Sequence, residues 1–337
     1  MRNALRARVT SWDYILAALV LVLLSSAALA QPGFASGFNF ANSISQMSDK
    51  ALLVLPLALL IIAREIDISV ASIAGLSGVV LGMALHAGMS LSLAITLALL
   101  TGTLCGLLNA ALVTLVGLPS LVVTLGTLAL FRGLCYVLLG GTPIADIPLS
   151  LITFGTDTLP GTYLPWDILP FLVLAPLFAI FLHRTPTGRR VYAIGGGPEI
   201  AVYSGVRVNR IRFALFVASG LLAALAGVIT VARTSQAAPD GALGFELDAI
   251  TVVFLGGVSV LGGKGRMPGV IWALVLVVAL RSMLQLGNVS GYAQGTAVGL
   301  LLILSLLITN ATHRIHTALT RRRLSPAPAP ARQSVGS

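Results

Sequence analysis

Ionisable side chains are rare in this sequence, so the few that interrupt its apolar segments are the first candidates for chemistry. Arg64, Glu65 and Asp67 stand close together between two apolar runs. A charged group inside a bilayer is costly, and it therefore marks a functional site by default. Two interpretations stay open for this cluster: an ion-pair network that holds a broken helix together, or a gate on a solute pathway.

The remaining reactive side chains do not assemble into an enzymatic site. The four histidines are scattered and, apart from His313 and His316 in a basic tail, lack the spacing of metal ligands. The glycine-rich stretch at 262–265 resembles a phosphate-binding loop. That motif requires glycine where Val258 stands and Ser or Thr where Gly265 stands. We predict a tight turn there, no enzymatic activity, no metal site and no cofactor held by this chain.

The composition indicates an all-α polytopic membrane protein. Of its 337 residues, 57% are hydrophobic and only 9% are charged, whereas a soluble domain carries about 25% charged residues. Uninterrupted apolar runs of about 20 residues are typical of helices that cross a bilayer. The net charge of +10 would point to nucleic acid in a soluble protein, but here the positions of the charges matter more than their sum. We expect a lipid bilayer as the surrounding partner, and no nucleic acid.

Ten apolar segments predict about ten transmembrane helices, some of them short or broken. They occupy residues 13–30, 51–63, 66–85, 89–116, 121–139, 166–182, 211–231, 247–261, 270–286 and 294–308. The segments at 51–63 and 247–261 are short or interrupted, which is typical of broken or re-entrant helices that line a pathway. The first segment is either an uncleaved helix, which we adopt, or a secretory signal with a cleavage site at residues 28–30.

The basic residues set the expected orientation. They gather before the first segment, between the sixth and seventh, between the eighth and ninth, and after the tenth. Positive charge is retained in the cytoplasm, so we place both termini there, in a bacterial cytoplasmic (inner) membrane. We expect a cytoplasmic N-terminal end at 1–12 and a single transmembrane domain at 13–311, with a cytoplasmic loop at 183–212. A basic, Pro/Ala-rich, disordered cytoplasmic tail follows at 312–337.

The predicted cytoplasmic loop contains the most informative pattern. Three glycines at 195–197 indicate a flexible approach to a short helix. Pro198 suits the first helical position, and Glu199 complements the positive end of a helix. Ala201 favours a helix, and Gly205 suits the position just past its end. We predict a helix of about two turns, which is too short to persist in water without a packing partner. A structured connector is the alternative.

These residues resemble a known motif. Glu199, Ala201 and Gly205 are similar to the EAA motif of bacterial importer permeases. The loop around them is similar to the ribose/xylose/rhamnose/autoinducer-2 branch of ABC permeases of the branched-chain-amino-acid type. Further stretches resemble that family in the same order: Ile66-Asp67-Ile68-Ser69, Gly106-Leu107-Leu108-Asn109, Gly117-Leu118-Pro119-Ser120, Glu246-Leu247-Asp248-Ala249-Ile250 and Gly256-Gly257-Val258-Ser259. The resemblance covers roughly residues 50–308.

The resemblance implies the permease subunit of an ATP-driven (ABC) importer for a sugar or sugar-like solute, working by alternating access. It implies that Pro198, Glu199, Ala201 and Gly205 belong to a coupling helix, which docks on cytoplasmic ATP-binding subunits that hold ATP and Mg²⁺. It also implies a periplasmic sugar-binding protein and a second permease subunit, identical or paralogous. The solute stays open among pentoses, hexoses, deoxysugars and autoinducer 2.

Polar side chains within the apolar segments are candidates for the solute pathway, because a sugar needs hydrogen-bond partners along its route. They are Asp67, Ser69, Asn109, Thr124, Thr127 and Ser259. Such groups also bond helices to one another in membranes, so both roles stay open. Arg64 and Glu65 are candidates for a gate or an ion pair. The alternative function, a secondary active transporter for a small polar solute, would use Glu65 and Asp67 for ion coupling.

Overall fold

The computed structural model describes residues 2–291, 293–304 and 307, with residues 2–11 described by their backbone alone. Apart from two isolated β-bridges, every regular element in this part of the chain is a helix, so the predicted all-α class is confirmed. The predicted tail at 312–337 and the end of the last apolar segment lie outside the described residues.

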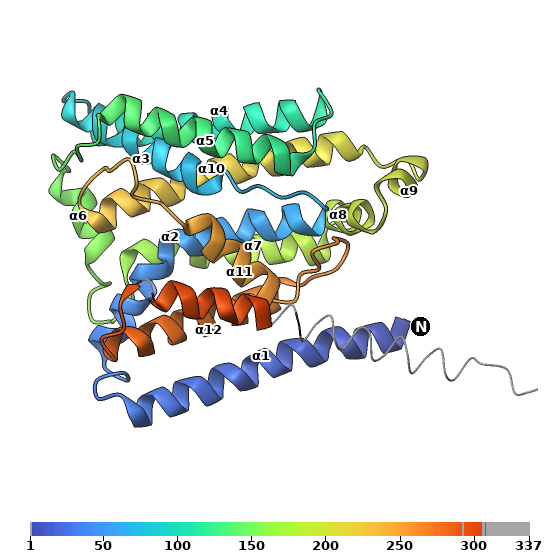
Figure 1. The fold of residues 1–337 in the computed structure, drawn as a ribbon, viewed down its shortest axis with the longest axis horizontal. Helices are drawn as coiled ribbons and strands as arrows, with labels where there is room; N and C mark the ends of the chain where they lie inside the picture. Colours follow the sequence, from blue (N-terminus) through green and yellow to red (C-terminus); the bar gives the residue numbers. More distant parts are fainter. Residues whose placement is uncertain (1, 292, 305–306, 308–337) are drawn as a thin grey trace, which may run out of the picture.

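The helices follow the order shown in Figure 1: α1 (Arg2–Ala30), α2 (Gly37–Ile62), α3 (Val70–His86), α4 (Leu91–Thr114), α5 (Ser120–Leu139), α6 (Leu149–Thr156), η1 (Trp166–Ile168), α7 (Leu169–Arg184), α8 (Pro186–Gly196), α9 (Pro198–Tyr203), α10 (Val208–Thr234), α11 (Phe245–Leu255) and α12 (Met267–Leu286). Ala293–Leu304 forms a further helix. Among the described residues, seven helical segments are long and apolar enough to cross a membrane: α1, α2, α4, α5, η1 with α7, α10 and α12.

The prediction for α2 is wrong at its start. The helix begins at Gly37 and has 26 residues, whereas the apolar pattern predicts a start at residue 51. Its first half is rich in Asn, Ser and Gln, which hid it from a count of apolar residues. Ser36 caps the helix by accepting a hydrogen bond from the backbone N–H of Asn39 at 3.2 Å. The bundle buries nearly all of α2 from Met47 onward, whereas the polar first half is half-buried or exposed.

Three further elements differ from the prediction. α11 ends at Leu255 rather than at residue 261, because Gly257 adopts a left-handed conformation (φ +82°) in the turn that follows. The short helix α6 lies in a stretch where we predicted only a loop. α8 was also not predicted; it replaces the flexible approach that three glycines suggested, and it includes Gly195 and Gly196.

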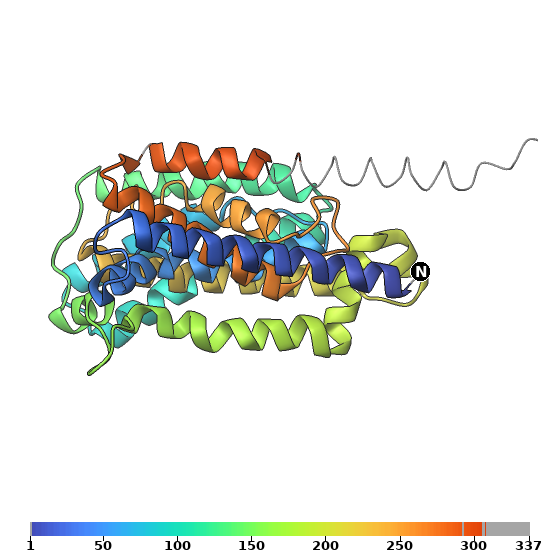
Figure 2. The ribbon, with the colours of Figure 1, turned by 90° about the horizontal axis from the view of Figure 1, so that it is seen from below.

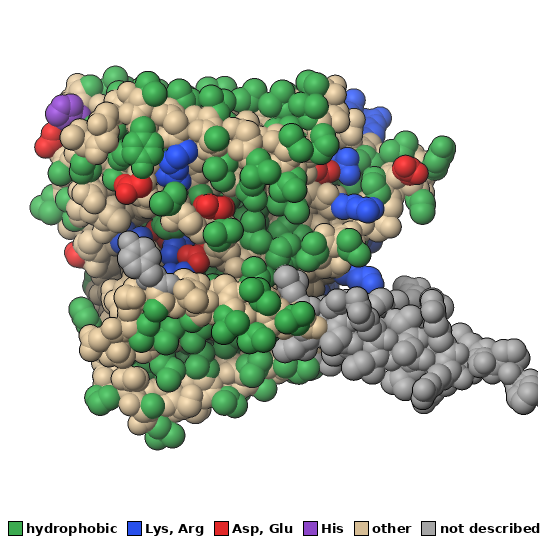
Figure 3. Space-filling view, viewed as in Figure 1, with side chains coloured by type: hydrophobic (Ala, Val, Ile, Leu, Met, Phe, Trp, Pro, Cys, Tyr) green, Lys and Arg blue, Asp and Glu red, His purple; other side chains and the backbone are tan. Residues whose placement is uncertain are grey.

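α2 and α10 form the centre of the bundle. α10 packs against α2, α3, α4 and α6, and α2 also contacts α7, α11 and α12. Figure 1 shows α4 and α5 along one edge and α1 along the opposite edge, and Figure 2 shows α7 on a separate face. Many apolar side chains of these outer helices are exposed, which gives much of the green surface in Figure 3. Such a surface suits contact with lipid.

The backbones of α4 and α10 lie in direct contact. Gly102 and Gly106 of α4 face Gly220 of α10, and a Cβ atom added at Gly220 would lie 2.2 Å from the backbone oxygen of Gly102. A Cβ added at Gly227 would likewise lie 2.2 Å from the backbone oxygen of Ala74 in α3. Small residues four apart, as at Gly102 and Gly106, allow helices in membranes to approach this closely. The glycines therefore hold α10 at the centre of the bundle.

We expect Gly220→Val to destabilise the folded protein, because the added side chain collides with the α4 backbone. Overpacking of a core costs about 1–3 kcal/mol, occasionally more. The measurement is the melting temperature of the purified protein in detergent. Gly126→Val is the matched control, since nothing lies within 4 Å of a Cβ added at Gly126. Equal melting temperatures for the two variants would contradict the described contact between α4 and α10.

Candidate functional site

The chain leaves the helical conformation between α2 and α3, at residues 63–69. Arg64 adopts a left-handed backbone conformation with φ +68°, and the chain then passes along α5. The N–H of Ile66 donates to Ser120 Oγ (3.3 Å), and the Ile66 carbonyl accepts a hydrogen bond from Thr124 Oγ1 (3.2 Å). Irregular backbone at membrane depth is tolerated only where protein or a water-filled cavity surrounds it. Side chains of α5 supply that environment for the break.

Asp67 lies at the centre of a buried polar cluster. Its Oδ1 accepts hydrogen bonds from the N–H and the hydroxyl of Ser69 (3.0 and 2.6 Å), and its Oδ2 accepts one from the hydroxyl of Ser219 in α10 (2.9 Å). Asn109 of α4 donates to Ser69 Oγ at 2.8 Å. All four side chains are fully buried. The structure thus brings together three predicted pathway residues, packed between helices, and their contact with solute stays a prediction.

Glu65 forms an ion pair, but not with its sequence neighbour. Its Oε1 lies 2.7 Å from Nε of Arg212 near the start of α10, and the Glu65 side chain is only 7% exposed. Arg64 is exposed instead. No spacing rule connects Glu65 to Arg212, because the two meet only when α10 packs beside the break. Sequence reasoning therefore missed the partner.

The remaining predicted pathway residues lie at different levels of the bundle. Thr127 is buried on α5, one turn beyond Thr124. Ser259 lies beyond the end of α11 at Leu255, and its role in the pathway stays a prediction. It lies in the turn at 256–266, where its N–H donates to the carbonyl of Lys264 at 2.9 Å. This is the tight turn predicted from the glycines at 262–265, and it packs at the same end of the molecule as α8.

α8 and α9 form a structured unit at one end of the bundle (Figure 1). Pro198 opens α9, Ala201 is buried, and Gly205 follows the helix with φ +78°. Glu199 is exposed. The predicted short helix is therefore present: it covers six residues, Pro198–Tyr203, and Gly205 of the motif lies just past its end. Its outer face carries three exposed apolar side chains, Ile200, Val202 and Tyr203.

α8 is joined tightly to the end of α2. A Cβ added at Gly195 would lie 1.8 Å from the backbone oxygen of Ile62, and the N–H of Gly263 donates to that same oxygen at 2.8 Å. The Tyr192 hydroxyl donates to the carbonyl of Gly265 at 2.7 Å. Burial raises the pKa of Tyr192 to about 12, so this hydroxyl keeps its proton at physiological pH. Three segments thus meet at the residue where α2 ends.

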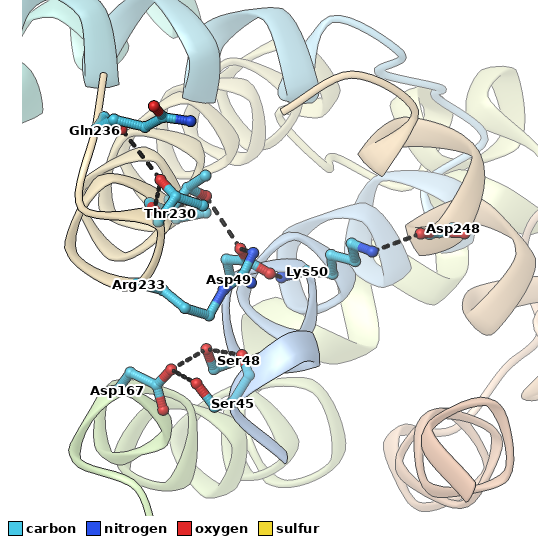
Figure 4. A network of polar contacts seen from close by, with 11 residues as sticks. Ser45, Ser48, Asp49, Lys50, Asp167, Thr230, Arg233, Gln236 and Asp248 are labelled. Carbon is cyan, nitrogen blue, oxygen red and sulfur yellow. Dashed lines mark hydrogen bonds and ion pairs between the residues drawn. The ribbon is translucent and has the colours of Figure 1, made fainter. Parts of the chain in front are cut away.

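A second polar network lies at the other end of α2, near α6 (Figure 4). Asp49 is fully buried; its Oδ2 lies 2.9 Å from Nη2 of Arg233 and accepts a hydrogen bond from Thr230 at 3.1 Å. Asp167 of η1 is also buried, and its Oδ2 accepts hydrogen bonds from Ser45 (2.6 Å) and Ser48 (2.8 Å). These contacts attach α10 and η1 to the polar half of α2.

Lys50 extends this network toward α11 and α12. Its Nζ lies 3.0 Å from Oδ2 of Asp248, whose Oδ1 lies 2.5 Å from Nη2 of Arg281. The same ammonium stands 4.8 Å above the ring of Phe245, which adds a cation–π contact. Sequence reasoning missed this network, although Asp49 and Lys50 directly precede an apolar run. Both residues fall outside the apolar segment at 51–63, so a pattern of apolar residues does not place them on a helix.

Comparison with known proteins identifies the family. Residues 39–311 match the model of the "branched-chain amino acid transport system / permease component" family. The chain belongs to this family, and it is a permease subunit of an ABC importer in the cytoplasmic membrane. The match covers both polar networks, the break and the α8–α9 unit.

The chain is similar to curated relatives over nearly its whole length. It is 35% identical over 326 residues to the autoinducer 2 import system permease protein LsrD of Escherichia coli K12, covering 94% of this chain and 98% of the relative. The same figures hold for the proteins of that name in Escherichia coli O157:H7 and Shigella flexneri. No solved structure matches.

We expect Arg212→Met to destabilise the protein by about 3 kcal/mol, because it leaves the Glu65 carboxylate buried without its cation. The measurement is the melting temperature in detergent, with Arg207→Met as the control on an exposed neighbour. The double variant Glu65→Gln with Arg212→Met should regain part of the loss, since no unpaired charge remains. A double variant as unstable as the sum of both single variants would contradict the pairing.

Proposed function

We propose that this permease carries an uncharged sugar-like solute, with autoinducer 2 as the leading candidate, by alternating access. The observation that carries the mechanism is the α8–α9 unit, whose exposed apolar face stands at one end of the bundle while its backbone abuts the end of α2. The solute class rests on the similarity to the autoinducer 2 permease over nearly the full chain. A movement imposed on α9 would reach the break at 63–69 through Ile62.

The proposal includes partners that supply energy and selectivity. Cytoplasmic ATP-binding subunits hold ATP and Mg²⁺ and contact α9 through Glu199, Ile200 and Tyr203. Buried Ala201 packs α9 against the bundle, and Gly205 lets the chain turn after the helix. A periplasmic binding protein delivers the solute, and a second permease subunit, identical or paralogous, completes the pathway. Closed ATP-binding subunits bind one orientation of the pathway more favourably than the other. A partner can shift a two-state equilibrium only through such a difference in binding free energy.

The proposed topology has ten membrane segments with both termini in the cytoplasm. The seven long helices are joined by two shorter apolar helices, α3 and Ala293–Leu304, and by α11 as a broken segment. The N-terminal end of α1 lies at the same end of the bundle as α8 and α9 (Figure 1). The exposed arginines of this end, among them Arg189 and Arg190, agree with a cytoplasmic position.

The break between α2 and α3 is the proposed moving part of the pathway. Asp67, Ser69 and Asn109 lie where α3, α4 and α10 meet, so a shift of α2 would change their exposure. The rival function, a secondary transporter, receives less support. Glu65 pairs with Arg212, and Asp67 accepts three hydrogen bonds, so neither carboxylate stands open to a coupling ion.

We expect Gly205→Asp to abolish both ATP-driven uptake and co-purification of the ATP-binding subunit. A left-handed conformation costs a residue with a Cβ about 1–2 kcal/mol, and the carboxylate adds charge beside α9. Gly161→Asp is the matched control, because Gly161 also has a positive φ (+74°) with nothing within 4 Å of an added Cβ, but lies at the other end.

The control should keep both activities, and both variants should reach the membrane in normal amount. Replacing Glu199 and Ala201 together by Lys should give the same loss as Gly205→Asp. Normal uptake in these variants would contradict the proposal that α9 couples the permease to the ATP-binding subunits. Uptake in liposomes by the chain alone, without ATP, would favour the secondary transporter instead.

A cysteine-labelling experiment tests the topology. We expect Tyr163→Cys to react with a membrane-impermeant maleimide on intact cells, and Arg189→Cys to react only after the membrane is opened. The native Cys105 and Cys135 are buried, so background labelling should be low. Both variants must react in opened membranes as the control. Labelling of Arg189→Cys on intact cells, or no labelling of Tyr163→Cys on intact cells, would contradict the proposed orientation.

A further inference from the structure

A cavity of about 520 Å³ opens at the end of the bundle opposite α9, between the polar half of α2 and the α6–η1 region. Its size falls in the range of about 300–1,000 Å³ that is typical of small-molecule sites. The lining residues come from three parts of the fold, among them Phe38, Asn42, Gln46 and Lys50 from α2, Thr158 from the α6–η1 region, and Arg233 from α10.

The wall of this cavity offers hydrogen-bonding groups that the fold itself does not use. Asn42 and Gln46 lie one helical turn apart on α2 and are half-buried. Neither side-chain amide makes a hydrogen bond within the part of the chain that the structure describes. Each amide can donate two hydrogen bonds and accept others. Thr158 adds a hydroxyl from the facing wall.

The charges around the cavity are balanced. Three basic side chains, Lys50, Arg233 and Arg281, face three carboxylates, Asp49, Asp167 and Asp248. Each cation already lies within 3.0 Å of a carboxylate oxygen. An anionic ligand would add a negative charge beside three buried carboxylates, with no further cation in this network to balance it, which is unfavourable in a site of low dielectric. A neutral ligand meets no such penalty.

We propose that this cavity binds the solute as a neutral polyhydroxylated molecule of monosaccharide size and excludes its phosphorylated or carboxylated counterparts. Asn42, Gln46 and Thr158 hydrogen-bond the hydroxyl groups, and the exposed ring of Phe38 at the rim covers a C–H face of the sugar. The inference rests on the proposed function and deepens it. It places a binding site on α2, away from the predicted pathway residues around Asp67.

The position of the cavity fits a solute that arrives from outside the cell. In the proposed topology this end of the bundle faces the periplasm, because it lies opposite α8 and α9 (Figure 1). Lys50, at the inner edge of the cavity, also lines a small space of about 30 Å³ between α2 and α12, together with Gln46 and Arg281. The site is therefore bordered on its inner side by the ion pairs shown in Figure 4.

The test measures protection of an introduced cysteine in the complete transporter, assembled in membrane vesicles. Asn42→Cys and, on the facing wall, Thr158→Cys are each labelled with an impermeant maleimide. The probes are autoinducer 2, D-ribose, D-xylose and L-rhamnose, each at saturating concentration, against D-ribose 5-phosphate and D-gluconate. Tyr163→Cys is the control, because it is exposed near the cavity but does not line it.

We expect at least one neutral sugar to slow labelling of Asn42→Cys or Thr158→Cys severalfold, with no effect of the two anions and no change at Tyr163→Cys. Equal protection by the anions, protection by no neutral probe, or equal slowing at the control would overturn the inference. ATP-driven uptake of the same probes is measured in parallel on the unmodified complex. If a sugar is imported but protects neither position, the cavity inference is wrong and the proposed function stands. If a sugar protects a cysteine but no sugar is imported, the cavity inference stands and the proposed function is wrong.

Discussion

A backbone that leaves the helical conformation inside a membrane has no water to bond to, and the centre of this molecule is arranged around that constraint. Between α2 and α3 the free N–H and carbonyl groups of Ile66 are bonded by Ser120 and Thr124 of α5. The Asp67 carboxylate then joins the start of α3 to α10 through Ser219. The break is therefore a defined structure with partners on three neighbouring helices, and α10 can pack against it only because its glycines permit close approach.

The same reasoning applies to charge. The carboxylates of Asp49, Glu65 and Asp248 each meet a cation from another element of the fold: α10 for Asp49 and Glu65, and α2 and α12 for Asp248. Such pairs contribute little net stability, yet breaking one is costly, so they specify which helices lie together. Here the ion pairs fix how α2 packs against α10 and α11, and how α11 packs against α12.

The sequence predicts the all-α class, the short helix at Pro198 and the turn at 262–265, because apolar runs and Gly/Pro positions report local backbone preference. It does not predict the first half of α2, whose polar residues face a cavity rather than lipid. It also does not predict the Glu65–Arg212 pair, since 147 positions separate two residues that meet only in the packed bundle. The spacing of Gly102 and Gly106 was a readable signal for the α4–α10 contact, and it went unused.

α2 is one helix of about 39 Å, from its 26 residues at 1.5 Å each. Pro56 lies in its interior. Because proline has no N–H to donate to the preceding turn, the helix lacks one backbone hydrogen bond there and bends more easily at this point. The cavity-lining residues lie before this proline and Ile62 lies after it. A proline in a helix interior is a common position for a bend, so the segments of α2 before and after Pro56 can tilt relative to each other. In the alternating access proposed above, such a tilt would let the cavity end of α2 move while the end at Ile62 stays in place.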